Sequence, residues 1–225
     1  MCGRFTLQIP PELLAEIFGL AEISEITVLA RFNIAPTQQI LVIRQYADYQ
    51  RHLDALHWGL IPSWTKDAPT GPPLINARCE TIAEKPAFRQ AIKYRRCLIP
   101  ASGFFEWRRE GEKKTPLYIK LKDGSPMILA GIWESWKSTD GKTVDSGSIL
   151  TTVANNLIAP IHDRMPVILN PSDWEQWLDR DQRDPEKLKA LYQSFPAEEI
   201  EMHPVPPMVN SVKNAGPELV KPLVG

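Results

Sequence analysis

Short runs rich in β-branched and aromatic residues recur along the chain, and turn residues separate them. Runs over residues 40–46, 51–58, 96–99, 127–133 and 148–154 are typical of strands. Most of them follow another strand-like run rather than a helix, which favours hairpins and antiparallel pairing. The chain has twenty-one prolines against twelve glycines, which agrees with many rigid loops between short elements.

Helical patterns are few and lie outside these runs. Expected helices cover residues 11–20, 81–92, 170–178 and 184–192, the second from the capping-box spacing of Thr81 and Glu84. Further strands are expected over 104–109 and 116–121, as a hairpin, and over 166–169 and 200–205. We therefore predict an α+β fold in a single domain over residues 1–225, with a mainly antiparallel, barrel-like β-sheet and peripheral helices.

The charges nearly balance over the whole chain, with 26 Lys and Arg against 27 Asp and Glu and a net charge of −1. This balance excludes binding to nucleic acid through overall basicity, but a local basic surface stays open. Residues 76–122 hold twelve basic and five acidic side chains, whereas residues 170–202 hold four and nine. The total therefore hides a basic middle and an acidic tail, although both could be solvated faces.

No apolar run reaches the ~18 to 20 residues that a membrane span needs, and the N-terminus lacks a signal-peptide core. Three cysteines without regular spacing argue against a disulfide framework. The histidines and cysteines also lack the paired spacing of a metal site, so we expect neither a metal nor another cofactor. These features place the protein inside the cell, in the cytoplasm or at the nucleoid if it is bacterial.

Cys2 is the first candidate for chemistry. Removal of Met1 would leave a cysteine with two nucleophiles on adjacent carbons, the thiol and an α-amine with a reference pKa of roughly 7.7 to 8. Such an amine forms a Schiff base with an aldehyde, after which the thiol can close a five-membered thiazolidine ring. Two alternatives stay open, namely thiolate attack on an acyl group with the amine as base, and a buried, unreactive cysteine.

Four further positions carry polar side chains in patterned surroundings. His162 could move protons at neutral pH, and Glu106, flanked by aromatic residues, would gain general-acid character if it were buried. Asn76 and Arg78 would share one face of a strand, where an amide can orient a nucleophile and a guanidinium can bind phosphate. The alternatives are a hydrogen-bonded core histidine, an outward-facing glutamate, loop capping and a surface charge.

Seven short segments, each weak alone, appear in a fixed order. They are Met1-Cys-Gly-Arg-Phe5, Arg31-Phe-Asn-Ile-Ala-Pro36, Trp58-Gly-Leu-Ile-Pro62 with Trp64, Ile75-Asn-Ala-Arg78 with Glu80-Thr81, Cys97-Leu-Ile-Pro100, Gly103-Phe-Phe-Glu-Trp107 and His162-Asp-Arg-Met-Pro166. Together they closely resemble the SRAP family, the SOS response-associated peptidases or abasic-site processing proteins. The resemblance runs from Cys2 to about Asn214.

The resemblance implies covalent chemistry on DNA. Members of the family bind single-stranded DNA at abasic sites and join their N-terminal cysteine to the ring-opened sugar as a thiazolidine, which shields the lesion during the response to DNA damage. Self-processing as a peptidase, lyase activity and reversal of the crosslink are further expectations for such an enzyme. The expected partner is single-stranded DNA with abasic sites, bound by a monomer and without a membrane.

Matching the motifs assigns roles to single residues. Cys2 would be the nucleophile, Asn76 would position it, and Glu106 would act as the acid/base that helps to open the deoxyribose. His162 would handle protons at the Schiff-base stage. The expected DNA contacts are phosphates at Arg4, Arg78 and Arg164, and bases beside the lesion at Pro36 and Trp64.

Two functions of other classes stay open. An N-terminal-nucleophile glutamine amidotransferase or hydrolase also begins Met-Cys-Gly, and it would use the Cys2 thiolate to hydrolyse glutamine. A non-catalytic DNA-binding module would retain intact and abasic strands equally. Ammonia release from glutamine and denaturing electrophoresis with abasic single-stranded DNA distinguish the three functions.

Overall fold

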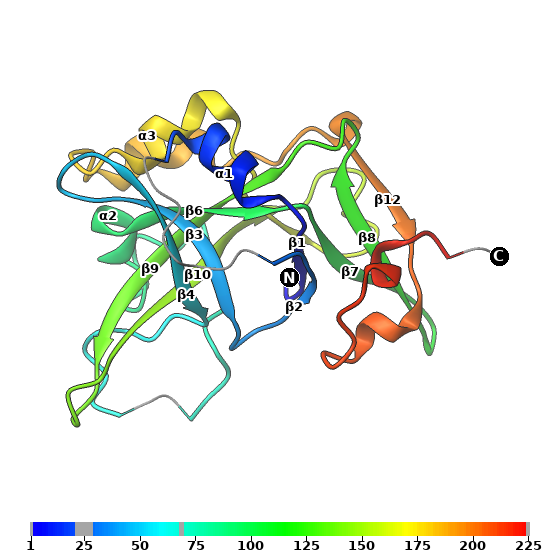
Figure 1. Cartoon of the computed structure of the whole chain (residues 1–225), viewed down its shortest axis with the longest axis horizontal. Coiled ribbons are helices and arrows are strands. Elements are labelled where there is room, and N and C mark those ends of the chain that lie inside the picture. Colours follow the sequence, from blue (N-terminus) through cyan, green and yellow to red (C-terminus); the bar gives the residue numbers. More distant parts are fainter. Residues whose placement is uncertain (1, 21–28, 68–69, 224–225) are drawn as a thin grey trace.

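Five strands of the computed structural model, which describes residues 2–20, 29–67 and 70–223, pair into a closed ring (Figure 1). They are β3 (Gln39–Gln45), β4 (Arg51–Trp58), β6 (Arg96–Ala101), β9 (Met127–Lys137) and β10 (Thr143–Val153). The pairing runs β10-β4-β3-β6-β9 and returns from β9 to β10. The β10–β4 pair is parallel and the other four are antiparallel, so the ring forms a small barrel.

Two short strands extend the pairing of β10 beyond the ring. β5 (Asn76–Arg78) runs parallel to β10, and β11 (Arg164–Pro166) runs antiparallel to it. Thr151 of β10 pairs with Arg78 on β5 and with Pro166 on β11, so β5 and β11 lie on opposite sides of β10. Two segments that are distant in the sequence thus flank one strand.

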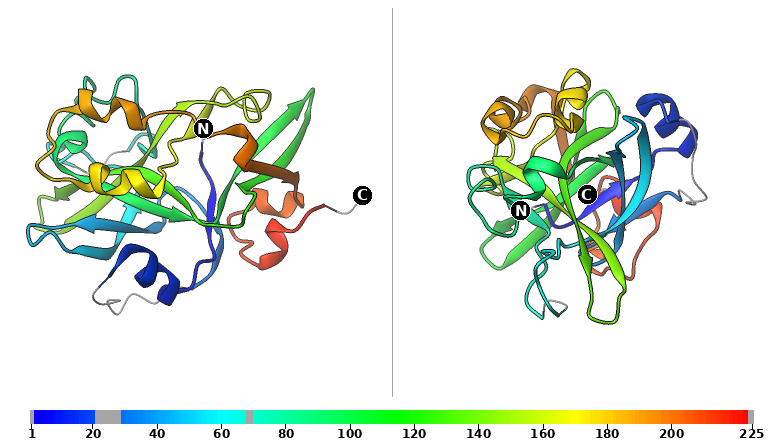
Figure 2. Two further views of the ribbon diagram at one scale, coloured as in Figure 1. Left: turned by 90° about the horizontal axis from the view of Figure 1, so that it is seen from above. Right: turned by 90° about the vertical axis from the view of Figure 1, so that its left-hand side faces the viewer.

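A second sheet contains five antiparallel strands in the order β12-β8-β7-β1-β2 (Figures 1 and 2). They are β1 (Phe5–Leu7), β2 (Arg31–Ile34), β7 (Gly103–Glu110), β8 (Lys113–Leu121) and β12 (Ile200–Pro204). β1 lies between β2 and β7, where Phe5 pairs with Ile34 on one side and with Phe104 on the other. The first strand of the chain is therefore inside its sheet, and the residues before it are carried into the interior.

A glycine at the start of β7 permits the close approach of β8. Gly103 pairs with Thr6, and a Cβ atom at Gly103 would lie 2.6 Å from the Tyr118 ring and from the carbonyl oxygen of Ile119. The hydroxyl groups of Thr6 on β1 and Tyr118 on β8 form a hydrogen bond of 2.8 Å beside Gly103. A larger residue at position 103 would displace the neighbouring strand β8.

The helices are short and lie at the periphery (Figures 1 and 2). α1 (Pro11–Phe18) ends at Gly19 in the left-handed conformation, with φ of 61°, and its Phe18 ring lies 5.0 Å from that of Trp174. The other elements are α2 (Ala91–Tyr94), α3 (Trp174–Leu178) and the 3₁₀ helices η1 (Pro171–Asp173), η2 (Pro185–Leu191), η3 (Ala197–Glu199), η4 (Pro207–Asn210) and η5 (Pro217–Val220). Among the described residues, no helix has the length and apolar character of a membrane span.

Most buried apolar side chains belong to one cluster that draws residues from Cys2 to Ile200. A smaller cluster around Phe105 and Tyr118 receives Val205, Val209 and Leu219 from the C-terminal segment. The predicted α+β fold, with a mainly antiparallel barrel and peripheral helices, is confirmed.

The prediction of a helix from Thr81 toward residue 92 is wrong over most of its length. Residues 79–90 form successive turns, and the α-helix comprises only Ala91–Tyr94. Pro86 explains the difference, because it lacks an N–H group and disfavours the helical conformation of the residue before it. The expected helix over 184–192 is instead the 3₁₀ helix η2, and β11 ends at Pro166 where a strand was expected to 169.

Candidate active site

Cys2 is completely buried just before β1. The carbonyl of Arg4 accepts a 2.9 Å hydrogen bond from the backbone N–H of Phe105, so the N-terminal segment continues the pairing of β1 with β7. Burial and, to a smaller degree, the negative charge of Glu106 raise the pKa of the Cys2 thiol above its ordinary value. The thiol is therefore protonated at neutral pH.

Asn76, the first residue of β5, holds the backbone of Cys2. Its side-chain Nδ2 donates a 2.9 Å hydrogen bond to the Cys2 carbonyl, and its pairing with Ile149 of β10 fixes its position. The Asn76 Oδ1 atom is buried and has no hydrogen-bond partner among the residues that the structure describes. The amide thus presents an acceptor next to the N-terminal segment.

Glu106 reaches the same place from β7. It lies opposite Leu117 of β8, and only 5% of the residue is exposed. Its carboxylate is close enough to Cys2 to contribute to the raised thiol pKa. The structure therefore shows the buried alternative for Glu106, and the pairing of β7 with β1 explains why it lies beside the N-terminus.

His162 lies just before β11, on the other side of β10 from Asn76. Its Nδ1 atom accepts a hydrogen bond of 2.9 Å from the backbone N–H of Arg164. The Oδ1 atom of Asp163 lies 2.9 Å from the same nitrogen, although the two residues are adjacent in the sequence. The imidazole is half-buried, and its Nδ1 nitrogen is held by its own loop.

The three predicted phosphate-binding arginines differ in their surroundings. Arg78 is exposed at the end of β5, two residues after Asn76. Arg4 donates to Asn33 Oδ1 at 2.6 Å and to the Val209 carbonyl at 2.8 Å. Arg164 is buried and forms a bidentate ion pair with Glu80. Of the three, Arg78 presents its guanidinium to solvent, whereas the other two bind groups of the protein.

The two residues expected to contact bases are accessible. Trp64 is 66% exposed, which is unusual for so large an apolar side chain, and Pro36 is partly exposed in the connection between β2 and β3. Such a tryptophan offers a ring face for stacking. The structure thus brings Asn76 into contact with Cys2, places the buried Glu106 near Cys2, and leaves Arg78, Pro36 and Trp64 accessible.

The roles of Glu80 and Asn33 were missed in the sequence. Both lie within the seven motif segments, Glu80 two residues after Arg78 and Asn33 in the third position of β2. Their partners Arg164 and Arg4 are far away in the sequence, so spacing carries no signal for these contacts. An acidic or amide residue inside each arginine-containing motif was the available hint.

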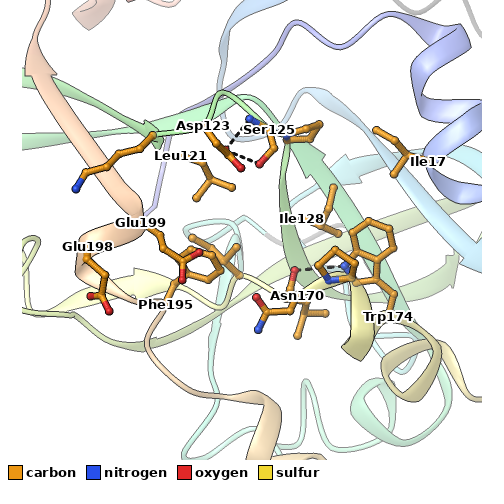
Figure 3. Close-up of a pocket in the computed structure, with 15 residues that line it drawn as sticks. Ile17, Leu121, Asp123, Ser125, Ile128, Asn170, Trp174, Phe195, Glu198 and Glu199 are labelled. Carbon is orange, nitrogen blue, oxygen red and sulfur yellow. Dashed lines mark hydrogen bonds between the residues drawn. The ribbon is translucent and has the colours of Figure 1, made fainter.

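Other parts of the described structure contribute no further site residues. His, Cys, Asp and Glu side chains nowhere gather in groups of three that could hold a metal ion, within the described ranges. A cavity of about 750 Å³ lies between α1, the β8–β9 connection and α3 (Figure 3). Leu121, Trp174, Phe195 and Glu198 are among its lining residues, and the lining contains none of the predicted site residues.

Comparison with known proteins places the chain in one family. The family model of the SOS response associated peptidase (SRAP) matches residues 1–212. The abasic site processing protein YoqW of Bacillus subtilis is 42% identical over 223 residues, which cover 98% of this chain and 99% of that protein. The abasic site processing protein YedK of Escherichia coli is 35% identical, with 99% and 100% covered.

A solved structure agrees with this result. The crystal structure of a protein from Bacteroides thetaiotaomicron superposes with a TM-score of 0.87 at 27% identity, covering 99% of this chain and 100% of that one. Sequence motifs, fold and site geometry therefore lead to the same conclusion. The chain belongs to the SOS response associated peptidase (SRAP) family.

Proposed function

We propose that this protein recognises abasic sites in single-stranded DNA and forms a covalent thiazolidine with them through Cys2, after Met1 has been removed. The observation that carries the proposal is the contact of Cys2 with Asn76 and its closeness to the buried Glu106. The names of the relatives YoqW and YedK, which call them abasic site processing proteins, support it. The crosslink would shield the lesion during the response to DNA damage.

The chemistry requires one condensation, one addition and no cofactor. The Cys2 α-amine attacks the sugar aldehyde, and loss of water from the resulting carbinolamine leaves an imine. The thiol then adds across the C=N bond, with sulfur bonding to carbon and a proton passing to nitrogen. A thiol whose pKa is raised by burial stays protonated until this second step, so the amine reacts first.

Asn76, Glu106 and His162 take different parts in this sequence. Asn76 holds the Cys2 backbone through Nδ2, and its buried Oδ1 can accept a hydrogen bond from the α-amine. Glu106 exchanges the proton needed to open the closed sugar and, in reverse, to close it. His162 exchanges protons at the imine stage.

DNA would lie across the accessible residues. Arg78 contacts a phosphate close to the nucleophile, and Trp64 and Pro36 pack against bases beside the lesion. Phosphate contacts by Arg4 and Arg164 stay predictions. For Arg4 the contact requires the side chain to exchange Asn33 for DNA, whereas Arg164 would contact a phosphate while it keeps its ion pair with Glu80. The protein would act as a monomer inside the cell.

Related activities fit the same site. Reversal of the thiazolidine follows the same steps backward, and an imine intermediate also permits the strand cleavage of a lyase. Peptidase activity would be confined to exposing Cys2. A glutamine amidotransferase would need a Cys2 thiolate, which the raised pKa of this thiol opposes.

The test distinguishes the contribution of the Cys2 α-amine from that of the Cys2 thiol. Mature protein, Cys2→Ala and a form with a retained N-terminal tag are each incubated with abasic and with intact single-stranded DNA. We expect a heat-stable adduct only for mature protein with abasic DNA. Cys2→Ala keeps an α-amine and should give an adduct only after borohydride reduction, whereas the tagged form should give none. An undiminished adduct from the tagged form, or ammonia release from glutamine without any adduct, would refute the proposal.

A further inference from the structure

The side chain of Arg164 joins three segments around β10. Its Nη1 and Nη2 atoms donate to the two carboxylate oxygens of Glu80, at 2.6 and 2.9 Å, and Nη2 also donates to the backbone carbonyl of Thr151 on β10. The Arg164 side chain is only 9% exposed, so water weakens this bidentate pair little on the arginine side. Glu80 lies just after β5 and Arg164 begins β11, so the ion pair ties together the two strands that flank β10.

The backbone of the same arginine orients His162. The N–H of Arg164 donates to His162 Nδ1 at 2.9 Å. A neutral imidazole carries one proton, and the contact with the Arg164 N–H favours the tautomer that carries this proton on Nε2. When the ring is protonated, Nδ1 becomes a donor, and the Asp163 carboxylate is the acceptor 2.9 Å away.

The contacts of Arg164 connect the Glu80 carboxylate to the His162 imidazole. The Glu80 carboxylate fixes the Arg164 guanidinium, the position of Arg164 fixes its N–H group, and this N–H fixes Nδ1 of His162. Glu80 follows β5, the strand that carries Asn76, and Arg164 lies on β11, next to His162. The ion pair therefore holds the segments on the two sides of β10 in a fixed relative position.

We infer that Glu80 is a positioning residue, which holds His162 through Arg164 in the orientation and tautomer that the imine stage needs. The role of His162 in the reaction rests on the proposed function, whereas the orientation of its ring by Glu80 through Arg164 does not. Glu80 would act on the rate of ring closure without contacting DNA or the sugar.

A kinetic cycle tests the inference. Single-turnover adduct formation is followed for wild type, Glu80→Gln, His162→Ala and the double variant. We expect Glu80→Gln to slow formation of the heat-stable adduct about ten- to a hundredfold, and the double variant to be no slower than His162→Ala alone, because both changes act through one imidazole. Glu80→Asp, which keeps the carboxylate, should recover part of the rate.

Matched controls exclude a general effect on charge or folding. Glu201→Gln breaks another ion pair on the surface, 2.6 Å from Lys120, and should leave the rate unchanged. Non-covalent binding of Glu80→Gln to intact single-stranded DNA should equal that of wild type. Tighter binding would instead mean that Glu80 masks Arg164 from phosphates, and it would overturn the inference, as would rate losses that multiply in the double variant.

A second measurement does not depend on the reaction. Long-range ¹H–¹⁵N NMR spectra report the tautomer of each histidine, with the His162 signals assigned by their loss in His162→Ala. We expect the neutral Nε2–H form in wild type and a mixture of tautomers in Glu80→Gln. An unchanged tautomer overturns the inference even if the adduct forms. A changed tautomer in a protein that forms no adduct upholds the positioning role and refutes the proposed function instead.

Discussion

The side chain of Asn76 donates a 2.9 Å hydrogen bond to the backbone carbonyl of Cys2, joining β5 of one sheet to the segment that precedes β1 of the other. The bond holds the main chain of Cys2 rather than its sulfur. Neither of the groups that the proposed chemistry uses, the α-amine and the thiol, takes part in this bond, while the position of Cys2 is fixed. This relationship gives the first prediction.

Replacing Asn76 by Ala should slow adduct formation by about ten- to a hundredfold, because a small displacement of the nucleophile is costly when the reacting atoms must align. Binding of intact single-stranded DNA should not change. Asn76→Asp serves as the matched variant, since a carboxylate keeps the size but cannot donate to the Cys2 carbonyl. Equal rates for all three proteins would remove Asn76 from the site.

Replacing Glu106 by Gln should slow both formation and reversal of the adduct, each by ~100-fold or more, because the variant cannot exchange a proton. Its similar size should keep the packing around β7. The measurement is a time course of adduct formation and of adduct transfer to competitor DNA. Wild-type rates in both directions would show that Glu106 takes no part in proton transfer.

Replacing His162 by Ala should slow formation of the heat-stable adduct but still allow a Schiff base that borohydride traps. The reason is that the imidazole is assigned to the proton exchange at the imine stage, after the amine has attacked. Parallel gels with and without borohydride measure the two species. Loss of the trapped species as well would move His162 to the first step.

Replacing Arg78 by Ala should weaken binding to abasic and intact single strands alike, because phosphates carry no information on the lesion. The slope of log affinity against log salt should fall by about 0.7, the value for one phosphate contact on a single strand. Arg180→Ala, at an exposed position in the acidic tail, is the control and should change neither quantity. An unchanged slope in Arg78→Ala would exclude the phosphate contact.

The Glu80–Arg164 ion pair should make the free energy of unfolding depend on pH in the acidic range. The hydrogen bond from Arg164 holds the pKa of Glu80 below its ordinary value of 4.5. A carboxyl with a lowered folded-state pKa stabilises the protein above the unfolded-state value, and this stabilisation is lost as the pH falls through the folded-state value. Glu80→Gln should therefore be less stable than wild type by about 1 kcal/mol at neutral pH, and the difference should shrink in acid. Thermal unfolding of both proteins from about pH 3 to 7 checks this; a constant difference would contradict it.

Local patterns predicted the elements whose partners are close in the sequence. The hairpin of β7 and β8 appears as expected, since alternation and a polar turn define both strands. β1 and β2 were not predicted as strands, because three or four residues are too few to show a period. The α+β barrel could thus be predicted as a class, whereas the position of its N-terminal strand could not.

The candidate site was named through the resemblance of seven motifs, not through spacing. Nothing local shows that Asn76 contacts Cys2, because β10 and β7 bring the two segments together. The same holds for Glu80 and Arg164, 84 residues apart. Contacts of this kind depend on strand order, which a single sequence does not reveal.

The complete burial of Cys2 beside β7 sets a time for its maturation. Glu106 and its strand are synthesised about a hundred residues after Cys2, which at roughly 5–20 residues per second leaves on the order of 5–20 s before the N-terminus finds its sheet partner on the ribosome. Once β1 has paired with β7, the Cys2 side chain is enclosed. On the proposed function, removal of Met1 in this interval would precede the burial of the Cys2 thiol.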